Sequence, residues 1–289
     1  MTVLLDGAMG TELSRRGFSL VSPKGSAGAL VEDPDLVRAI HLETVHAGAQ
    51  VITTNTFSLV EPDADAATLS VRLAREAIVH AAPDRPDAPR VRVAGCMGAL
   101  GRRASHAHNA ERYRAWGEAF ITAGCDLLVV ETLIDTTDAE VAAAALRPAR
   151  ARCPVWISAA FGLGGASFGE GSAAQMPVAD VDAFLVACTE RDALAPSLAN
   201  IPRHDGVWRG AAPSMGRTVD GKFLADGADP ESLTEALLQL TASCGLQVIG
   251  GCCGTTPAWI AGVAGRLHPT PQARALAFDA LDAHVEQRP

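Results

Sequence analysis

The sequence has little positive charge and no long apolar run. It carries 24 Lys and Arg residues against 33 Asp and Glu residues, so its formal net charge is −9. Proteins that bind nucleic acid normally gather basic residues on one surface, so this class is a poor candidate. No apolar run approaches the ~20 residues that a membrane-spanning helix needs, which argues against a membrane protein.

The sequence also lacks targeting and disulfide signals. Its first ten residues, MTVLLDGAMG, contain no basic segment followed by a long apolar stretch, so we expect a cytoplasmic protein without a signal peptide. Apolar residues make up 48%, which excludes disorder. The seven cysteines are an odd number in a chain long enough to bury a large core. They therefore favour reduced thiols, with any special cysteines serving as metal ligands or nucleophiles.

Short apolar stretches alternate with Ala-rich or amphipathic stretches along the whole chain, which is typical of an α/β fold. The predicted strands are 3–5, 51–54, 91–94, 127–130, 155–158, 196–199 and 247–250, with an eighth near 210–212. The predicted crossover helices are 34–47, 64–82, 110–123, 137–150, 177–191 and 230–243. Eight units of about 36 residues each predict a (β/α)8 TIM barrel. The rival is an open doubly wound sheet, but no Gly-rich dinucleotide fingerprint follows an early strand.

No linker, charge block or low-complexity tract marks a domain boundary, so we expect residues 1–289 to form a single domain. Residues 270–289 would form a C-terminal helical extension, with apolar positions that suit a capping or dimer helix. The oligomeric state stays open, and a homo-oligomer is compatible with the sequence.

Polar residues follow several predicted strands, where the active sites of such barrels lie. Glu131 directly follows the apolar run 127–130, and a carboxylate there is costly to desolvate unless a cation or donor meets it. Glu131 is therefore a candidate for binding a ligand amine. Cys96 follows the third strand, where it would either line the pocket or act as a nucleophile or ligand. The other residues at strand ends are Asp6, Asn55, Thr56, Thr132, Asn200, Cys252 and Cys253.

The segment GGCCGTTP at residues 250–257 is the strongest local signal. Neighbouring side chains alternate on a regular strand, but a break flanked by glycines lets both sulfurs of Cys252 and Cys253 converge. Two adjacent thiolates suit zinc, whereas the alternative is two small apolar residues in a tight turn. The Thr-Thr-Pro ending also predicts the start of a helix, with Thr as the cap.

Four segments in order resemble the homocysteine S-methyltransferases. They are DGAMGTEL at residues 6–13, the block from residue 26 to residue 57 that ends in VITTNTF, Glu131-Thr132 and GGCCGTTP. The resemblance runs from about residue 3 to about residue 266. It implies a (β/α)8 barrel in which three cysteine thiolates hold zinc and the zinc binds the homocysteine sulfur. That sulfur would attack the methyl group of a small donor such as S-methylmethionine, S-adenosylmethionine, betaine or a methylfolate.

Transferred by position, the resemblance makes Cys252 and Cys253 zinc ligands. Glu131 matches the glutamate that holds the amino-acid ammonium group, and Asp6-Gly7 matches the opening motif at the substrate pocket. Asn55 and Thr56 belong to the loop that lines it. The expected activity is an S-methyltransferase of methionine biosynthesis that acts on a small thiol acceptor and an onium-type donor.

The first zinc cysteine of the family ends strand six in an Asn-Cys pair, and the corresponding segment here reads SLANIP at residues 197–202. Depending on the alignment, the third ligand position falls on Asn200 or Ile201, and we expect Asn200 there. The alternatives are a nitrogen of His204, metal binding only with a ligand thiol present, or no metal at all. A metal-free site would indicate a transferase or lyase for another sulfur, selenium or onium compound, or a catalytically silent binding homologue.

Overall fold

The computed structural model describes residues 1–289 except 102–103, 163–171, 220–221, 226–228 and 287–289. In the described part, one sheet of eight parallel strands has the order β1-β10-β7-β6-β5-β4-β3-β2. The strands are β1 (Val3–Leu4), β2 (Val51–Thr53), β3 (Arg92–Gly98), β4 (Leu127–Leu133), β5 (Val155–Ala159), β6 (Ala183–Ala187), β7 (Trp208–Ala212) and β10 (Val248–Ile249). A parallel bridge between Leu5 and Val51 joins the first strand to the second and closes the sheet. This confirms the predicted (β/α)8 barrel.

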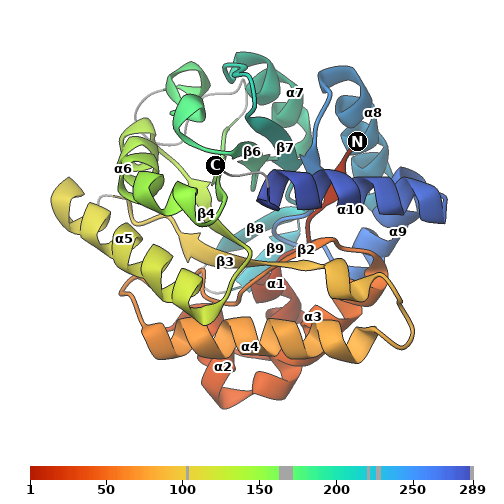
Figure 1. The fold of residues 1–289 in the computed structure, drawn as a ribbon, viewed down its shortest axis with the longest axis horizontal. Coiled ribbons are helices and arrows are strands. Elements are labelled where there is room, and N and C mark those ends of the chain that lie inside the picture. The colour runs from red at the N-terminus through yellow and green to blue at the C-terminus, as the bar shows by residue number, and fades with distance from the viewer. Residues whose placement is uncertain (102–103, 163–171, 220–221, 226–228, 287–289) are drawn as a thin grey trace.

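Helices surround the barrel, as Figure 1 shows. They are α1 (Met9–Arg15), α2 (Ala29–Glu32), α3 (Pro34–Ala47), α4 (Ala64–Ala81), α5 (His106–Ala123), α6 (Thr136–Leu146), α7 (Arg191–Asn200), α8 (Pro230–Cys244), α9 (Pro257–Leu267) and α10 (Pro271–Glu286). Two further strands, β8 (Gly216–Val219) and β9 (Lys222–Ala225), pair antiparallel between β7 and α8. None of the described helices is both long enough and apolar enough to span a lipid bilayer.

Local sequence signals explain where several helices begin. Asp33, Asp229 and Thr256 each precede a proline, and each side chain accepts a hydrogen bond from the backbone N–H three residues later. A cap of this kind satisfies an N–H group that has no partner within the helix, and proline at the first position loses nothing because its nitrogen needs no partner there. The predicted helix start at residues 255–257 is thus confirmed.

The prediction was wrong around the sixth strand. Residues 177–191, predicted as a helix, contain β6, whereas residues 196–199, predicted as the strand, lie in α7. The buried residues of α7 are Ala193, Leu194, Ser197 and Leu198. Their spacing is that of one helix face and differs from the alternation of a strand. The five residues of β6 are all buried, as expected for a strand with covered faces.

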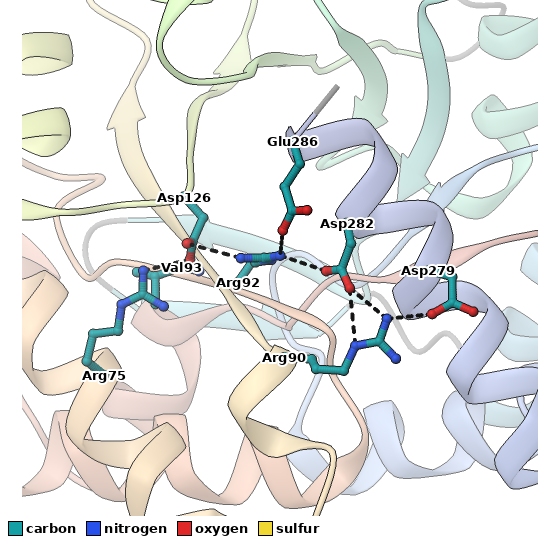
Figure 2. Close-up of polar contacts among 8 residues, drawn as sticks. All are labelled: Arg75, Arg90, Arg92, Val93, Asp126, Asp279, Asp282 and Glu286. Carbon is teal, nitrogen blue, oxygen red and sulfur yellow. Dashed lines mark hydrogen bonds and ion pairs between the residues drawn. The ribbon is translucent and has the colours of Figure 1, made fainter. Parts of the chain in front are cut away.

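Helix α10 lies across the amino-terminal end of the barrel and is held there by an ion-pair network (Figure 2). Asp282 of α10 pairs with Arg90 at 2.6 Å and with Arg92 at 2.7 Å, just before and at the start of β3. His284 stacks on the ring of Trp208 at 3.8 Å, at the start of β7. The predicted C-terminal helical segment therefore caps one barrel end and leaves the other free for a site.

Candidate active site

A cavity of about 320 Å³ opens at the carboxyl ends of the barrel strands. It collects most of the residues that the sequence singled out: Asp6, Gly7, Asn55, Cys96, Glu131, Thr132, Cys252 and Cys253. It also contains Cys188, which directly follows β6. Thr56 and Asn200 do not line this cavity.

Three thiols meet at one side of the cavity. The sulfur atoms of Cys188, Cys252 and Cys253 all lie within 4.8 Å of one another, and those of Cys188 and Cys253 are 3.5 Å apart. Among the described residues, this is the only group of three or more His, Cys, Asp or Glu side chains that lie close enough together to hold one metal ion.

Cys188 reaches this group because the chain turns sharply after β6. Its φ of 50° lies in the left-handed region, which costs a residue with a Cβ about 1–2 kcal/mol. Its backbone N–H donates to the carbonyl of Ala212 at 3.0 Å, and the buried hydroxyl of the next residue, Thr189, donates to the carbonyl of Ala187. Strained backbone held by its surroundings often occurs at functional sites.

The loop after β10 places the other two thiols. The backbone N–H of Cys252 donates to the carbonyl of Pro213, and the carbonyl of Cys253 accepts from the backbone N–H of Met215, both at 2.8 Å. The hydroxyl of Thr255 donates to the carbonyl of Cys252 at 2.7 Å. A Cβ on Gly251 would lie 2.7 Å from the Cβ of Thr255, so this turn requires glycine. The expected glycine-flanked break is therefore present.

The three thiols fit a metal ion well. With zinc–sulfur bonds of 2.3 Å, sulfur atoms at tetrahedral positions lie about 3.8 Å apart, close to the spacing observed here. Without a cation, the thiols of Cys188 and Cys252 resist ionisation. A hydrogen bond from Cys252 lowers the pKa of Cys188, but the hydrogen bond to Cys253 and burial outweigh it and raise that pKa to about 12. Three protein ligands with a fourth position open are typical of catalytic zinc sites.

The structure corrects the assignment of the third ligand position. Asn200 is the last residue of α7 and is exposed, and it does not line the cavity that holds the thiols. His204 is also exposed, and its Nδ1 lies 3.1 Å from the carbonyl of Asp205. The prediction that this chain lacks the first cysteine is wrong. The sixth strand of the barrel is β6, and the residue that follows it is Cys188, whereas the segment 197–202 lies at the end of α7 and just beyond it.

Two carboxyl groups face the cavity near the thiols. Asp6 accepts hydrogen bonds from the backbone N–H of Thr53 at 2.7 Å and from its hydroxyl at 3.1 Å. Burial, together with the nearby charge of Glu131, raises the pKa of Asp6 well above its ordinary value. Burial also raises the pKa of Glu131 to about 7, against a hydrogen bond from Cys96 that lowers it. A cation entering here would find two groups ready to ionise.

The loop after β2 supports the cavity from behind. The amide of Asn55 donates to the carbonyl of Ser26 at 2.9 Å, which ties this loop to the segment before α2. Thr56 is fully buried, and its hydroxyl donates to the carbonyl of Cys96 at 2.6 Å. The structure thus places Asn55 at the cavity wall and Thr56 one layer outside it.

The main residue that the sequence analysis missed is Cys188. Its only local signal is its position at the end of the buried run Ala183–Ala187. That run contains one β-branched residue and several helix formers, so it resembles a helical segment as much as a strand. Two apolar residues that line the cavity, Met9 and Leu20, were also not proposed as site residues.

The comparisons with known proteins agree with this geometry. The family model described as Homocysteine S-methyltransferase matches residues 3–267. The chain is 31% identical to the homocysteine S-methyltransferase of Escherichia coli, over 91% of this chain and 94% of that protein. It is 32% identical to the methionine synthase of Mycobacterium tuberculosis, over 90% of this chain but 24% of that protein.

A solved structure shows the same similarity in three dimensions. The metallated form of the homocysteine methyltransferase MmuM from Escherichia coli matches with a TM-score of 0.74 and 30% identity, over 92% of this chain and 96% of that chain. The family model, a relative matched over 94% of its length and a solved structure all name homocysteine methyltransferases. The chain belongs to the homocysteine S-methyltransferase family and is a methyltransferase.

Proposed function

We propose that this protein transfers a methyl group from a small onium-type donor to the sulfur of homocysteine. The observation that supports this most directly is the convergence of Cys188, Cys252 and Cys253 in the cavity that also holds Glu131. A site for an amino-acid thiol needs a group that activates sulfur and a group that binds an ammonium ion. The three thiols and Glu131, which would serve these two purposes, line one cavity.

Cys188, Cys252 and Cys253 would hold a zinc ion as thiolates. Bound zinc would supply the positive charge that lowers the pKa of the acceptor thiol, so that it is deprotonated at neutral pH without a separate base. All three side chains would lose their protons when the metal binds, so the raised pKa values of Cys188 and Cys252 without a cation do not oppose this role.

Glu131 would bind the acceptor through its ammonium group. The charge of the ammonium favours ionisation of a carboxyl group whose pKa lies near 7, so an ion pair forms when the substrate enters. Asp6 stays oriented by its two hydrogen bonds with Thr53 and faces the same space. Together these groups direct the acceptor so that its sulfur points toward the three thiols.

The donor would approach from the mouth of the cavity, where the lining is largely apolar. Met9, Leu20 and Phe57 contribute to this lining, and 43% of Phe57 is exposed. An onium donor spreads its charge over alkyl groups, which pack well against such side chains, and an aromatic face attracts a cation. Transfer of a methyl group then depends chiefly on positioning donor and acceptor in line.

The test is a methyl-transfer assay with the metal content measured in parallel. Purified protein with zinc is incubated with homocysteine and, separately, with S-methylmethionine, S-adenosylmethionine or betaine, and methionine is quantified by mass spectrometry. We expect methionine with at least one donor. If no donor gives methionine while homocysteine still raises the melting temperature, the protein binds the amino acid without catalysis and the proposal is wrong.

A further inference from the structure

We propose that Cys96 is a positioning residue, whose thiol orients the Glu131 carboxylate toward the ammonium group of the acceptor. This inference rests on the proposed function and assigns a task to a fourth cysteine of the same cavity. It replaces the alternative of a metal ligand, because Cys96 does not belong to the group of three thiols, and that of a nucleophile, because its raised pKa keeps the thiol protonated.

The strand register brings the two side chains together. Cys96 of β3 pairs with Val129 of β4, and Gly98 pairs with Glu131. Side chains two residues apart on a strand share a face, so Glu131 lies on the same face as Val129. Cys96 and Glu131 both line the cavity, close enough for the thiol of Cys96 to donate a hydrogen bond to the Glu131 carboxylate.

The backbone of Cys96 is held on both sides. Its N–H donates to the hydroxyl oxygen of Thr54 at 2.8 Å, and its carbonyl accepts from the hydroxyl of Thr56 at 2.6 Å. The two hydroxyl oxygens are themselves 2.9 Å apart. Thr54, Thr56 and Cys96 are all buried, so the thiol is presented from a rigid support with one rotatable side-chain bond.

The thiol of Cys96 acts as a hydrogen-bond donor toward Glu131. Burial, followed by the charge and hydrogen bond of Glu131, raises the pKa of Cys96 well above its ordinary value, so the proton stays on sulfur. A carboxylate offers about four lone-pair directions over its two oxygens. The thiol occupies one of them and leaves the remaining ones for the substrate.

The test compares Cys96→Ala with Cys96→Ser, each assayed with homocysteine and with 4-sulfanylbutanoate, which has the same thiol but no amino group. We expect Cys96→Ala to raise the KM for homocysteine about tenfold, the typical effect of losing one hydrogen bond to a charged group, with kcat changed less than twofold. Cys96→Ser keeps a donor and should stay within twofold of the parent. With 4-sulfanylbutanoate, Cys96→Ala and the parent should have the same KM.

The amine-free acceptor separates positioning from general structural damage. An equal loss with both acceptors, or an unchanged KM for homocysteine in Cys96→Ala, would overturn the inference. If Cys96→Ala does not fold, Cys96→Val fills the space without a donor and takes the same test. A parent protein that neither binds homocysteine in a calorimetric titration nor methylates it would overturn the proposed function along with this inference. If the parent is active and Cys96→Ala leaves the KM for homocysteine unchanged, only the inference about Cys96 is overturned.

Discussion

The sulfur atoms of Cys188 and Cys253 lie 3.5 Å apart although 65 positions separate the two residues in the chain. They follow β6 and β10, which are both neighbours of β7 in the barrel. The order of the strands therefore brings the third thiol to the pair that the sequence marks at residues 252–253. This relationship decides which residues belong in a metal-binding experiment.

Replacing Cys188 with Ala should abolish tight metal binding and methyl transfer, because two thiols hold a divalent ion far less firmly than three. Asn200→Ala is the matched control, since Asn200 is exposed at the end of α7 and should change neither quantity. Metal content after dialysis, measured by inductively coupled plasma mass spectrometry, checks both variants. A normal zinc content in Cys188→Ala would show that Cys188 is not a ligand.

Asn200→Cys gives an independent check of the same assignment. If Asn200 held the third ligand position, as expected from the sequence alone, a cysteine there would raise zinc affinity. The structure predicts no change, because residue 200 is exposed at the end of α7 and lies outside the cavity that holds the three thiols. Competition with a chromogenic chelator measures the affinity, and a gain in Asn200→Cys would reopen the earlier assignment.

Glu131 should make homocysteine binding depend on pH in the neutral range. Its pKa is raised to about 7, mainly by burial, so the charged form that binds an ammonium group grows as pH rises from 6 to 8. We expect the KM for homocysteine to fall over this range in the parent. Glu131→Gln should lower kcat/KM on the order of 100-fold and remove this part of the pH dependence, as expected when one partner of a buried charge pair is lost.

The control for Glu131→Gln is Glu140→Gln, because Glu140 is exposed on α6 and should leave the pH profile unchanged. Steady-state kinetics at five or six pH values in a constant-ionic-strength buffer provides the measurement. A Glu131→Gln variant with the KM of the parent throughout would show that the ammonium group binds elsewhere.

Gly251→Ala should disrupt the loop after β10 that carries Cys252 and Cys253. Its Cβ would lie 2.7 Å from the Cβ of Thr255, so the turn that carries Cys252 and Cys253 has to shift. We expect a loss of bound zinc and activity, and a loss of stability of about 1–3 kcal/mol from overpacking. The unfolding midpoint in urea and the metal content check this.

Gly262→Ala provides the comparison with an open glycine. It lies on the exposed side of α9, and nothing lies within 4 Å of a Cβ built there. Alanine is the better helix former by roughly 1 kcal/mol, so this variant should be as stable as the parent or more stable. Equal effects of both substitutions would contradict the argument from close approach at residue 251.

The ion-pair network under α10 should contribute to stability through Asp282 (Figure 2). The Asp282 side chain is 25% exposed and pairs with both Arg90 and Arg92, whereas the Asp279 side chain is 64% exposed and pairs with Arg90. We expect Asp282→Ala to lower the free energy of unfolding by roughly 1–2 kcal/mol and Asp279→Ala by less than about 0.5 kcal/mol. Denaturant titrations at low and high salt measure both, and equal losses would contradict the assignment.

The contribution of Asp282 to stability should also depend on pH. Burial raises the pKa of Asp282, but hydrogen bonds from Arg90 and Arg92 outweigh burial and lower this pKa below its ordinary value. Its contribution is therefore present above the ordinary pKa of Asp, about 3.9, and is lost as pH falls through the lower folded value. The difference in stability between the parent and Asp282→Ala should shrink in acid.

The alternation of apolar and helical stretches predicted the barrel, and the bounds of α3 were predicted to the residue. Helix α3 combines an Asp-Pro start, a periodic apolar face and a glycine just beyond its end, so local chemistry determines it. The segments 177–191 and 196–199 lack such signals. Their assignments were exchanged because a short buried strand with few β-branched residues has the composition of a helix.

The sequence by itself determined the family, the (β/α)8 barrel and the pair Cys252-Cys253, because each depends on residues close together in the chain. Only the tertiary structure identified Cys188 as the third thiol and joined Cys96 to Glu131. Those contacts arise between residues on different strands, and they become visible only when the strand register and the closure of the sheet are known.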